Sequence, residues 1–361
     1  RGTSNWFFSS VRFTGYSLFR WYGFNDPIKL SQIRQIPNMT GVVTAIYDVP
    51  VGELWPVDKV ESIQKELKKY NLALEVIESL PVHENIKLGA SDRDHYIDIY
   101  CKNIRTLSKY GIKCICYNFM PVFDWLRTTL NYKNKDGSTS LAFLYSDYIE
   151  LDKNNLHLPG WDESYTQEQL HDLLESYSNI THDTLFNNLI YFLDRVIPVC
   201  KECDINMAIH PDDPPLDIFQ LPRIMSTMDD FKRLFKAIPD LHNGMTLCTG
   251  SLTAGRHNDI YKITETFSHE GRIHFAHLRN IKLLGNDGSF TECAHLSSSG
   301  DIDMYMLIKI LVKNKFKGYV RPDHGRMIWN ESGNPGYGLY DRALGAAYLN
   351  GLFEAAKKEL Y

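Results

Sequence analysis

Residues 206–215 read NMAIHPDDPP, an apolar run that ends in a histidine and passes directly into a turn rich in proline and aspartate. A short apolar run bounded by turn-forming residues is typical of a buried strand. Three later segments share this design, with a cysteine, a histidine and an aspartate at the strand ends. They are MTLCTGS at 245–251, HFAHLRN at 274–280 and YVRPDHGR at 319–326. Each of the four segments therefore ends a predicted strand with a residue that can bind a metal ion.

Short β-rich runs alternate with amphipathic helical patterns from Phe19 almost to the C-terminus, which is typical of parallel strands joined by crossover helices. The eight runs that we expect to form strands are residues 19–22, 42–47, 73–77, 113–118, 206–210, 245–248, 273–277 and 318–321. Eight parallel strands imply a closed barrel. We therefore predict an α/β fold of the (β/α)₈ or TIM barrel type, closed by a last helix at about 340–360.

Three segments set the expected domain organisation. Residues 1–18 contain no acidic residue and show no clear helical or strand period, so we treat them as an extension of uncertain origin that resembles a transit peptide in composition. Residues 19–361 are predicted to form a single barrel domain. Within it, about 119–181 is longer than an ordinary connection between strand and helix. Because this insertion follows the fourth strand, we expect it on the active-site face, where it could cover a substrate.

Composition narrows the classes of function. The net charge of -5 and the pI near 6.2 argue against a surface built for nucleic acid or anionic lipid, and favour small-molecule chemistry. No stretch approaches 18 consecutive apolar residues, so no membrane span is expected. The seven cysteines are too few for a disulfide scaffold, and we expect reduced thiols and a cytoplasmic protein. The CxxC of Cys200 and Cys203 ends an apolar helical run and is interpreted as structural.

The four strand-end residues are His210, Cys248, His277 and Asp323. Parallel barrel strands deliver their C-terminal residues to one rim, so these four side chains should converge. Two imidazoles, a thiolate and a carboxylate suit a divalent transition metal better than Ca²⁺ or Mg²⁺. Taken singly, each histidine is more often a hydrogen-bonded core residue and Cys248 a small buried hydrophobe. The occurrence of all four residues at strand ends favours a metal site, and Asp323 is the hardest of the four to explain in another way.

Candidate acid and base groups lie next to this set. His324 follows Asp323 directly, and an imidazole is suited to proton abstraction near neutral pH. Tyr337 and Tyr340 could donate a proton to a leaving hydroxyl, although a half-buried aromatic at the start of the last helix is the more probable role of Tyr340.

Charged residues near the same rim could serve the substrate. Arg279, Arg321 and Arg326 could bind a substrate carboxylate, and each could equally be a structural ion-pair partner. Asp212 and Asp213 could support the ligands but more often serve loops and helix caps, so neither is predicted to bind the metal.

Several longer motifs resemble the mannonate dehydratase family, which is related to the xylose-isomerase-like barrels. The motifs are FRWYG at 19–23, QIP at 35–37 followed by TGVV at 40–43, IYDVPVGELWP at 46–56, MAIHPDDPP at 207–215, RPDHGR at 321–326 and PGYGLYDRALGAAYLNGL at 335–352. The resemblance runs from about Phe19 to the C-terminus, and residues 1–18 depart from it. It implies a Mn²⁺ or Fe²⁺ ion held by the four predicted ligands, with His324 and Tyr337 as the proton-transfer groups.

The implied reaction is the dehydration of D-mannonate to 2-keto-3-deoxy-D-gluconate in hexuronate catabolism. The proton next to a carboxylate is weakly acidic, so a base needs a cation that stabilises the developing charge. His324 would take the C2 proton and Tyr337 would protonate the C3 hydroxyl, or the two roles could be reversed. Two alternatives stay open: a metal-dependent sugar isomerase on the same fold, and a barrel that binds a sugar acid without catalysis. A homo-oligomer is possible.

Overall fold

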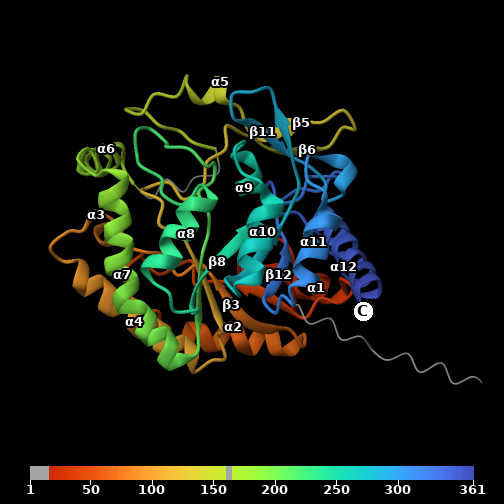
Figure 1. Cartoon of the computed structure of the whole chain (residues 1–361), viewed down its shortest axis with the longest axis horizontal. Coiled ribbons are helices and arrows are strands. Elements are labelled where there is room, and N and C mark those ends of the chain that lie inside the picture. The colour runs from red at the N-terminus through yellow and green to blue at the C-terminus, as the bar shows by residue number, and fades with distance from the viewer. Residues whose placement is uncertain (1–15, 160–164) are drawn as a thin grey trace, which may run out of the picture.

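The computed structural model describes residues 16–159 and 165–361, and its centre is a closed barrel of eight parallel strands (Figure 1). The barrel strands are β1 (Tyr16–Arg20), β2 (Gly41–Thr44), β3 (Ala73–Glu78), β4 (Cys114–Tyr117), β7 (Asn206–Ile209), β8 (Asn243–Cys248), β9 (Ile273–Leu278) and β12 (Tyr319–Pro322). Their order around the barrel is β1, β12, β9, β8, β7, β4, β3, β2, and β2 pairs with β1 to close the ring. The predicted TIM barrel is thus confirmed.

All eight predicted strands are present, and the largest change in position is at the first. The prediction placed its start at Phe19, whereas β1 begins at Tyr16, because the pairing with β12 already aligns Tyr16 with Tyr319. The last three residues of the predicted extension 1–18 therefore belong to the barrel. The rest of that extension lies outside the described residues.

Side chains of the strands alternate between the interior of the barrel and the layer under the helices, as the pleat of a strand requires. In β1, Leu18 belongs to a small inner cluster, whereas the neighbouring Phe19 belongs to the large core outside the barrel. The inner cluster consists of Leu18, Val43, Val76, Cys114, Cys116, Ala208 and Phe275. It fills part of the barrel interior, as side chains do in other small barrels.

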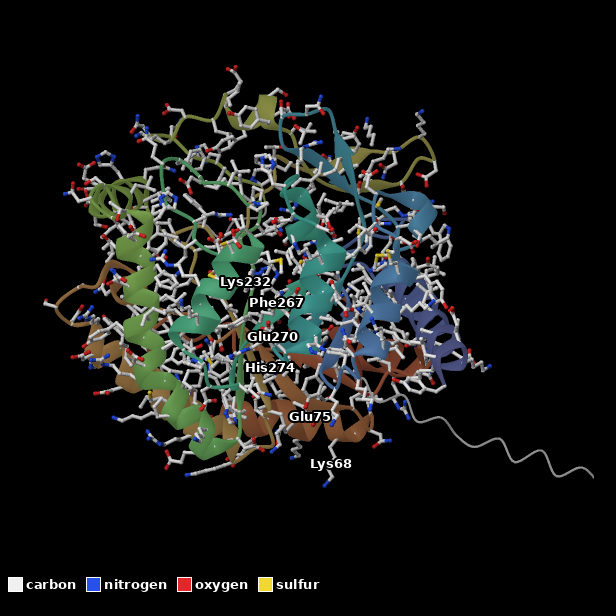
Figure 2. The ribbon with its side chains drawn as sticks, viewed as in Figure 1. Lys68, Glu75, Lys232, Phe267, Glu270 and His274 are labelled. Atoms are coloured by element: carbon white, nitrogen blue, oxygen red, sulfur yellow. The ribbon has the colours of Figure 1, made fainter. Side chains whose placement is uncertain are left out.

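Helices surround the barrel, with α4 and α7 on one side of Figure 1 and α11 and α12 on the other. The helices are α1 (Leu30–Gln35), α2 (Val57–Lys69), α3 (Glu84–Leu88), α4 (Arg93–Ser108), α5 (Tyr145–Tyr148), α6 (Gln167–Ser176), α7 (His182–Cys203), α8 (Met228–Ala237), α9 (Thr249–Ala254), α10 (Ile260–His269), α11 (Met304–Lys313) and α12 (Tyr340–Leu360), with a 3₁₀ turn at Ser297–Ser299. Phe267 of α10 shows how they pack. This residue, labelled in Figure 2, is fully buried. Its ring centroid lies 5.4 Å from that of Phe235 on α8.

A second, antiparallel sheet lies beyond one end of the barrel, at the top of Figure 1. Its strands, in spatial order, are β10 (Ile281–Leu284), β11 (Ser289–Glu292), β6 (Thr139–Phe143) and β5 (Thr129–Lys133). Strands β5 and β6 come from the predicted insertion, which is therefore partly ordered as a sheet. The hairpin β10–β11 follows β9 and was not predicted. This small sheet, which we call the cap sheet, joins two loops at the C-terminal end of the barrel.

Two further features concern the length of the helices and the state of the cysteines. Among the helices that the structure describes, none is long and apolar enough to cross a membrane. All seven cysteines are free, and Cys200 is fully buried near the end of α7. The side chains of Cys200 and Cys203 pack against the large core as small apolar groups, consistent with the structural interpretation of the CxxC.

Candidate active site

A cavity of about 390 Å³ opens at the C-terminal ends of the barrel strands, under the cap sheet. This volume falls within the range of small-molecule sites. Seven of the nine predicted site residues line the cavity: His210, His277, Arg279, Arg321, Asp323, His324 and Tyr337. Cys248 lies directly behind this wall, and Arg326 lies elsewhere. Eight residues spread over more than a hundred positions of sequence thus meet at one rim, as the parallel barrel predicts.

Three of the four predicted metal ligands form one compact group. The donor atoms of His210, Cys248 and His277 all lie within 4.8 Å of one another. His210 follows β7, and its Nδ1 lies 2.6 Å from the Pro211 carbonyl oxygen, so that Nδ1–H donates and Nε2 is the nitrogen that faces Cys248 and would bind an ion. Nε2 of the buried His277 lies 3.1 Å from Oε1 of Glu78, but the angle of this contact is not that of a hydrogen bond. A buried, unsatisfied nitrogen beside a thiol and a second imidazole suits a divalent transition metal.

Asp323, the fourth predicted ligand, lies at the edge of this group. Its Oδ2 is 3.6 Å from Sγ of Cys248, but both carboxylate oxygens also contact arginines. Arg321 Nη1 is 2.7 Å from Oδ1, and Arg279 Nε is 2.8 Å from Oδ2. Burial by itself would raise the pKa of Asp323, but these cations and His324 lower it well below its ordinary value. The carboxylate is therefore ionised and directed at the thiol.

The thiol and His210 form a charged pair. Burial alone would raise the pKa of Cys248, but Arg279 and His210 outweigh that effect and lower it well below the ordinary value. Burial alone would lower the pKa of His210, whereas the neighbouring Cys248 raises it to about 9. In the absence of an ion the pair is thus a thiolate beside an imidazolium. A thiolate is the form of cysteine that binds a metal.

Arginines and carboxylates alternate around the cavity in one continuous network. Arg20 contacts Glu78, Glu78 contacts Arg321, and Arg321 contacts Asp323. Arg279 then joins Asp323 to two further carboxylates, those of Asp213 and Glu292. Both of these also contact Arg127.

The members of this network come from distant segments and neutralise one another. Four guanidinium groups face four carboxylates, so the network is neutral as a whole. Arg127 and Asp213 are almost fully buried, and such charges are rarely buried unless they are paired. Arg127 precedes β5, and Glu292 ends β11. The network therefore ties the cap sheet to the barrel rim.

His324 and Tyr337 form a second functional pair at the cavity wall. Nε2 of His324 lies 3.0 Å from the phenolic oxygen of Tyr337, and Nδ1 contacts Oε1 of Glu292. The ring also meets Trp125 edge to face, with 6.3 Å between the centroids. Burial is the largest influence on Tyr337 and raises the pKa of its phenol, which is therefore protonated at neutral pH. The pair can hold or move a proton between its two members.

Three predicted candidates occupy structural positions. Arg326 donates to both carboxylate oxygens of Asp341 and is not among the residues lining the cavity, which fits the structural ion pair left open by the sequence. Tyr340 is 41% exposed at the start of α12, and its ring packs on Trp329. Asp212 accepts hydrogen bonds from Met225 N and Ser226 Oγ and so holds a loop. Asp213, in contrast, belongs to the charge network.

Sequence reasoning missed several residues of the site. Glu78 ends β3, and the strand-end rule would have found it if the predicted strand had been extended by one residue. It forms a second possible donor group with Cys116 and His277. That group is a poorer metal site, because burial raises the pKa of Cys116 well above its ordinary value and Glu78 is held by two arginines. No signal in the sequence marked Glu292, since its hairpin was not predicted.

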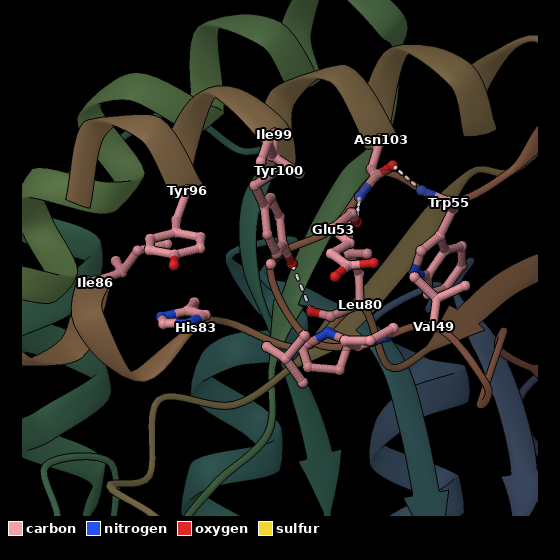
Figure 3. A pocket seen from close by; sticks show the side chains of 14 residues that line it. Val49, Glu53, Trp55, Leu80, His83, Ile86, Tyr96, Ile99, Tyr100 and Asn103 are labelled. Carbon is pink, nitrogen blue, oxygen red and sulfur yellow. Dashed lines mark hydrogen bonds between the residues drawn. The ribbon is translucent and has the colours of Figure 1, made fainter. Parts of the chain in front are cut away.

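A smaller pocket beside the barrel anchors the loop between β2 and α2 (Figure 3). Asn103 of α4 accepts a hydrogen bond from Trp55 N and donates one to the Glu53 carbonyl. Across the pocket, the rings of His83 and Tyr96 stack with centroids 3.6 Å apart. The same loop region begins near Tyr47, whose ring packs on Tyr22 of the main cavity wall. This pocket therefore supports the cavity from outside.

Comparisons with known proteins agree with this site. The family model described as D-mannonate dehydratase (UxuA) matches residues 16–360. A mannonate dehydratase of Streptococcus uberis is 50% identical over 342 residues, covering 94% of this chain and 98% of that protein. The crystal structure of mannonate dehydratase from Streptococcus suis serotype 2 superposes with a TM-score of 0.89 at 45% identity, covering 96% of this chain and 95% of that one.

The barrel itself is shared more widely. A xylose isomerase-like TIM barrel protein from Mycobacterium smegmatis superposes with a TM-score of 0.54 at 12% identity, over 91% of this chain and 87% of that one, which shows a common fold. The family match spans nearly the whole described chain, and the curated relatives share about half of its residues. The chain therefore belongs to the D-mannonate dehydratase family, whose members are hydro-lyases.

Proposed function

We propose that this chain dehydrates D-mannonate to 2-keto-3-deoxy-D-gluconate and water, with a divalent metal ion held by His210, Cys248, His277 and Asp323. The observation that carries the proposal is the meeting of two groups in one cavity. The donor atoms of His210, Cys248 and His277 lie within 4.8 Å of one another, and the His324–Tyr337 pair lines the same cavity. Elimination of water needs both a cation and a proton-transfer pair.

The donor set supports Mn²⁺ or Fe²⁺ as the ion. Imidazole and thiolate ligands suit transition metals, and the carboxylate of Asp323 adds a hard oxygen donor. When bound, the ion would offset the negative charge that develops on the substrate as the C2 proton leaves. The buried Nε2 of His277, which makes no hydrogen bond of good geometry although Glu78 lies 3.1 Å away, and the thiolate form of Cys248 both favour occupation by a cation.

Charge balance supports an anionic substrate. The four arginines and four carboxylates of the network cancel, and the thiolate of Cys248 contributes one negative charge. A divalent ion bound with neutral histidines would leave one positive charge in excess. An excess charge in a buried cavity is costly unless a counter-charge accompanies it. The single carboxylate of an aldonic acid supplies that counter-charge.

The arginines contribute to substrate binding in different ways. Arg279 and Arg321 line the cavity while their guanidinium groups are held by carboxylates, so we expect them to hold N–H donors in fixed positions beside the substrate carboxylate. Arg326 was predicted as a third such residue. Its contacts with Asp341 and Asp136 favour a structural role, and we leave it out of the proposed binding site.

His324 and Tyr337 would carry the protons. In one assignment, Nε2 of His324 takes the C2 proton and the phenol of Tyr337 protonates the C3 hydroxyl as it leaves as water. The electron pair of the C2–H bond forms the C2–C3 double bond of an enol, which then becomes the 2-keto product. The reverse assignment also balances: the phenol proton would first pass to Nε2 of His324 across their 3.0 Å contact, after which the phenolate takes the C2 proton and the imidazolium protonates the leaving hydroxyl. The raised pKa of Tyr337 favours it as the acid.

The test is direct. Purified protein loaded with Mn²⁺ is incubated with D-mannonate, and 2-keto-3-deoxygluconate is measured by chromatography. Formation of the product supports the proposal. Ketose formation from free aldoses, without keto-deoxy acid, would favour the isomerase. Binding of mannonate by the metal-loaded protein without turnover would favour the non-catalytic barrel. A cytoplasmic location and a homo-oligomeric state stay predictions from the sequence.

A further inference from the structure

We propose that Glu292 of the cap sheet is a positioning residue for the reaction. It accepts a hydrogen bond from Nδ1 of His324 and thereby directs Nε2 of that ring to Tyr337 and the cavity. The inference rests on the proposed function, since it assigns a role in the same dehydration. It goes further by making the cap sheet part of the catalytic apparatus.

The carboxylate of Glu292 has an unusual set of contacts. It ends β11, is 4% exposed, and receives three donors on one oxygen, Oε1. These donors are Arg127 Nη2, Arg279 Nη1 and His324 Nδ1. The other oxygen, Oε2, is buried without a hydrogen-bond partner. One oxygen is thus fixed from three sides, and it is the one that faces the imidazole.

This arrangement determines which nitrogen of His324 carries the proton. A carboxylate oxygen can only accept, so Nδ1 must be the protonated nitrogen of the neutral ring. Nε2 is then the acceptor, and the nearest donor to it is the phenol of Tyr337 at 3.0 Å. A ring held in the other tautomer would present N–H to the cavity and could not accept a proton there. Carboxylates that orient catalytic histidines in this way are known from other enzymes.

The position of Glu292 depends on two segments outside the barrel strands. Arg127 lies just before β5 of the cap sheet, and its guanidinium carbon is 4.9 Å from the centroid of the Phe290 ring on β11. Arg127 and Arg279 hold Glu292 while both also hold Asp213, which follows β7. The cap sheet therefore does more than cover the cavity. It places a fixed hydrogen-bond acceptor beside the ring of His324, which lies in the loop after β12.

Three variants test the role: Glu292→Ala, Glu292→Gln and, as the matched control, Asp213→Asn. Asp213→Asn removes one negative charge from the same two arginines but leaves His324 untouched. In Glu292→Gln, the side-chain oxygen can take the place of Oε1, which accepts from three donors, and the NH₂ group can take the place of Oε2, which has no hydrogen-bond partner. We expect Glu292→Ala to lower kcat per bound metal about a hundredfold or more, with KM changed about threefold or less. Glu292→Gln should recover at least about a tenth of the wild-type kcat.

Two measurements separate positioning from structural damage. Metal content and the visible spectrum of Co²⁺-loaded protein should match wild type in both Glu292 variants. The second measurement is NMR of protein that is labelled with ¹⁵N-histidine and loaded with Zn²⁺. The His324 resonances are assigned by their loss in His324→Asn. They should show a protonated Nδ1 in wild type and not in Glu292→Ala. An Nε2-protonated ring in wild type would overturn the inference.

The remaining outcomes are equally decisive. Equal losses of kcat per metal in Glu292→Ala and Asp213→Asn would show that only network charge matters, and would overturn the role. So would a Glu292→Gln variant no better than Glu292→Ala. Absence of turnover in wild type would instead reject the proposed function, while the NMR result would still report on the Glu292–His324 contact.

Discussion

Nε2 of His324 and the phenolic oxygen of Tyr337 lie 3.0 Å apart, although the two residues are 13 positions apart in the loop between β12 and α12. His324 lies near the start of this loop, directly after Asp323, and Tyr337 lies near its end, shortly before α12. Both side chains line the cavity that contains the metal-binding candidates. A base and an acid at this separation can act on neighbouring carbons of one substrate, which is the arrangement that removal of water requires.

His324→Asn should keep the fold and the bound metal while lowering kcat about a hundredfold or more, the usual effect of losing a general base or acid. The measurement is steady-state kinetics together with metal analysis. Exchange of the C2 proton with solvent assigns the role: its loss identifies His324 as the base, and retained exchange without dehydration identifies it as the acid. Near-normal kcat with unchanged metal content would remove His324 from the mechanism and leave Tyr337→Phe as the next test.

Cys248→Ser should weaken metal retention strongly, because serine is not a thiolate at neutral pH and the site would lose a charged donor. Cys200→Ser is the control, since Cys200 is equally buried but lies in α7 away from the rim. Metal content after dialysis is the measurement for both proteins, and Cys203→Ser serves as a second control. Equal metal content in all three variants would argue against Cys248 as a ligand.

Removal of the metal should abolish activity. Treatment with a chelator followed by gel filtration should give protein without turnover, and Mn²⁺ or Fe²⁺ should restore it, because the weakly acidic C2 proton cannot be removed without a compensating cation. Thermal unfolding should also shift to lower temperature without the ion, since a ligand that binds only the folded state stabilises it. Full activity in protein shown to be free of metal would contradict the metal site.

Arg326→Met should reduce stability and leave KM for mannonate unchanged. The guanidinium group is mostly buried and pairs with Asp341, whose side chain is 3% exposed. Its loss leaves a buried carboxylate without its cation, which should lower the free energy of unfolding by about 2–4 kcal/mol. Chemical denaturation and kinetics measure the two effects. A large rise in KM with unchanged stability would return Arg326 to the substrate site.

His274 should make stability depend on pH in the acid range. Burial lowers the pKa of this histidine to about 4, whereas the pKa of a histidine in the unfolded chain is near the ordinary value of 6.5. Between these values the unfolded chain binds a proton that the folded protein does not, so stability falls as the pH drops from about 6.5 towards 4. His274→Gln should flatten this part of the stability profile, and the exposed His269→Gln should leave it unchanged. Identical profiles in wild type and His274→Gln would contradict the prediction.

Local patterns were sufficient to predict the barrel and most of its rim. Apolar runs between turn residues and helical spacing are properties of neighbouring residues, so the eight strands could be found without knowing the contacts between them. The parallel barrel then requires the ends of its strands to meet, which is why His210, Cys248 and His277 could be grouped from sequence. In the structure, the donor atoms of these three residues lie within 4.8 Å of one another, as that rule predicts.

Contacts between distant segments were decided only by the tertiary structure. Glu292 and Arg127 lie 165 residues apart and meet because β11 and β6 pair in the cap sheet, a pairing that no local pattern indicates. Arg326 could be either a substrate or a structural residue until its contact with Asp341 was seen. The sequence by itself determined the strands, the rim and the kinds of donor atom, because these follow from short-range periodicity and one topological rule. The pairing of arginines with carboxylates depends on long-range packing. The same packing therefore decides which nitrogen of His324 faces the cavity.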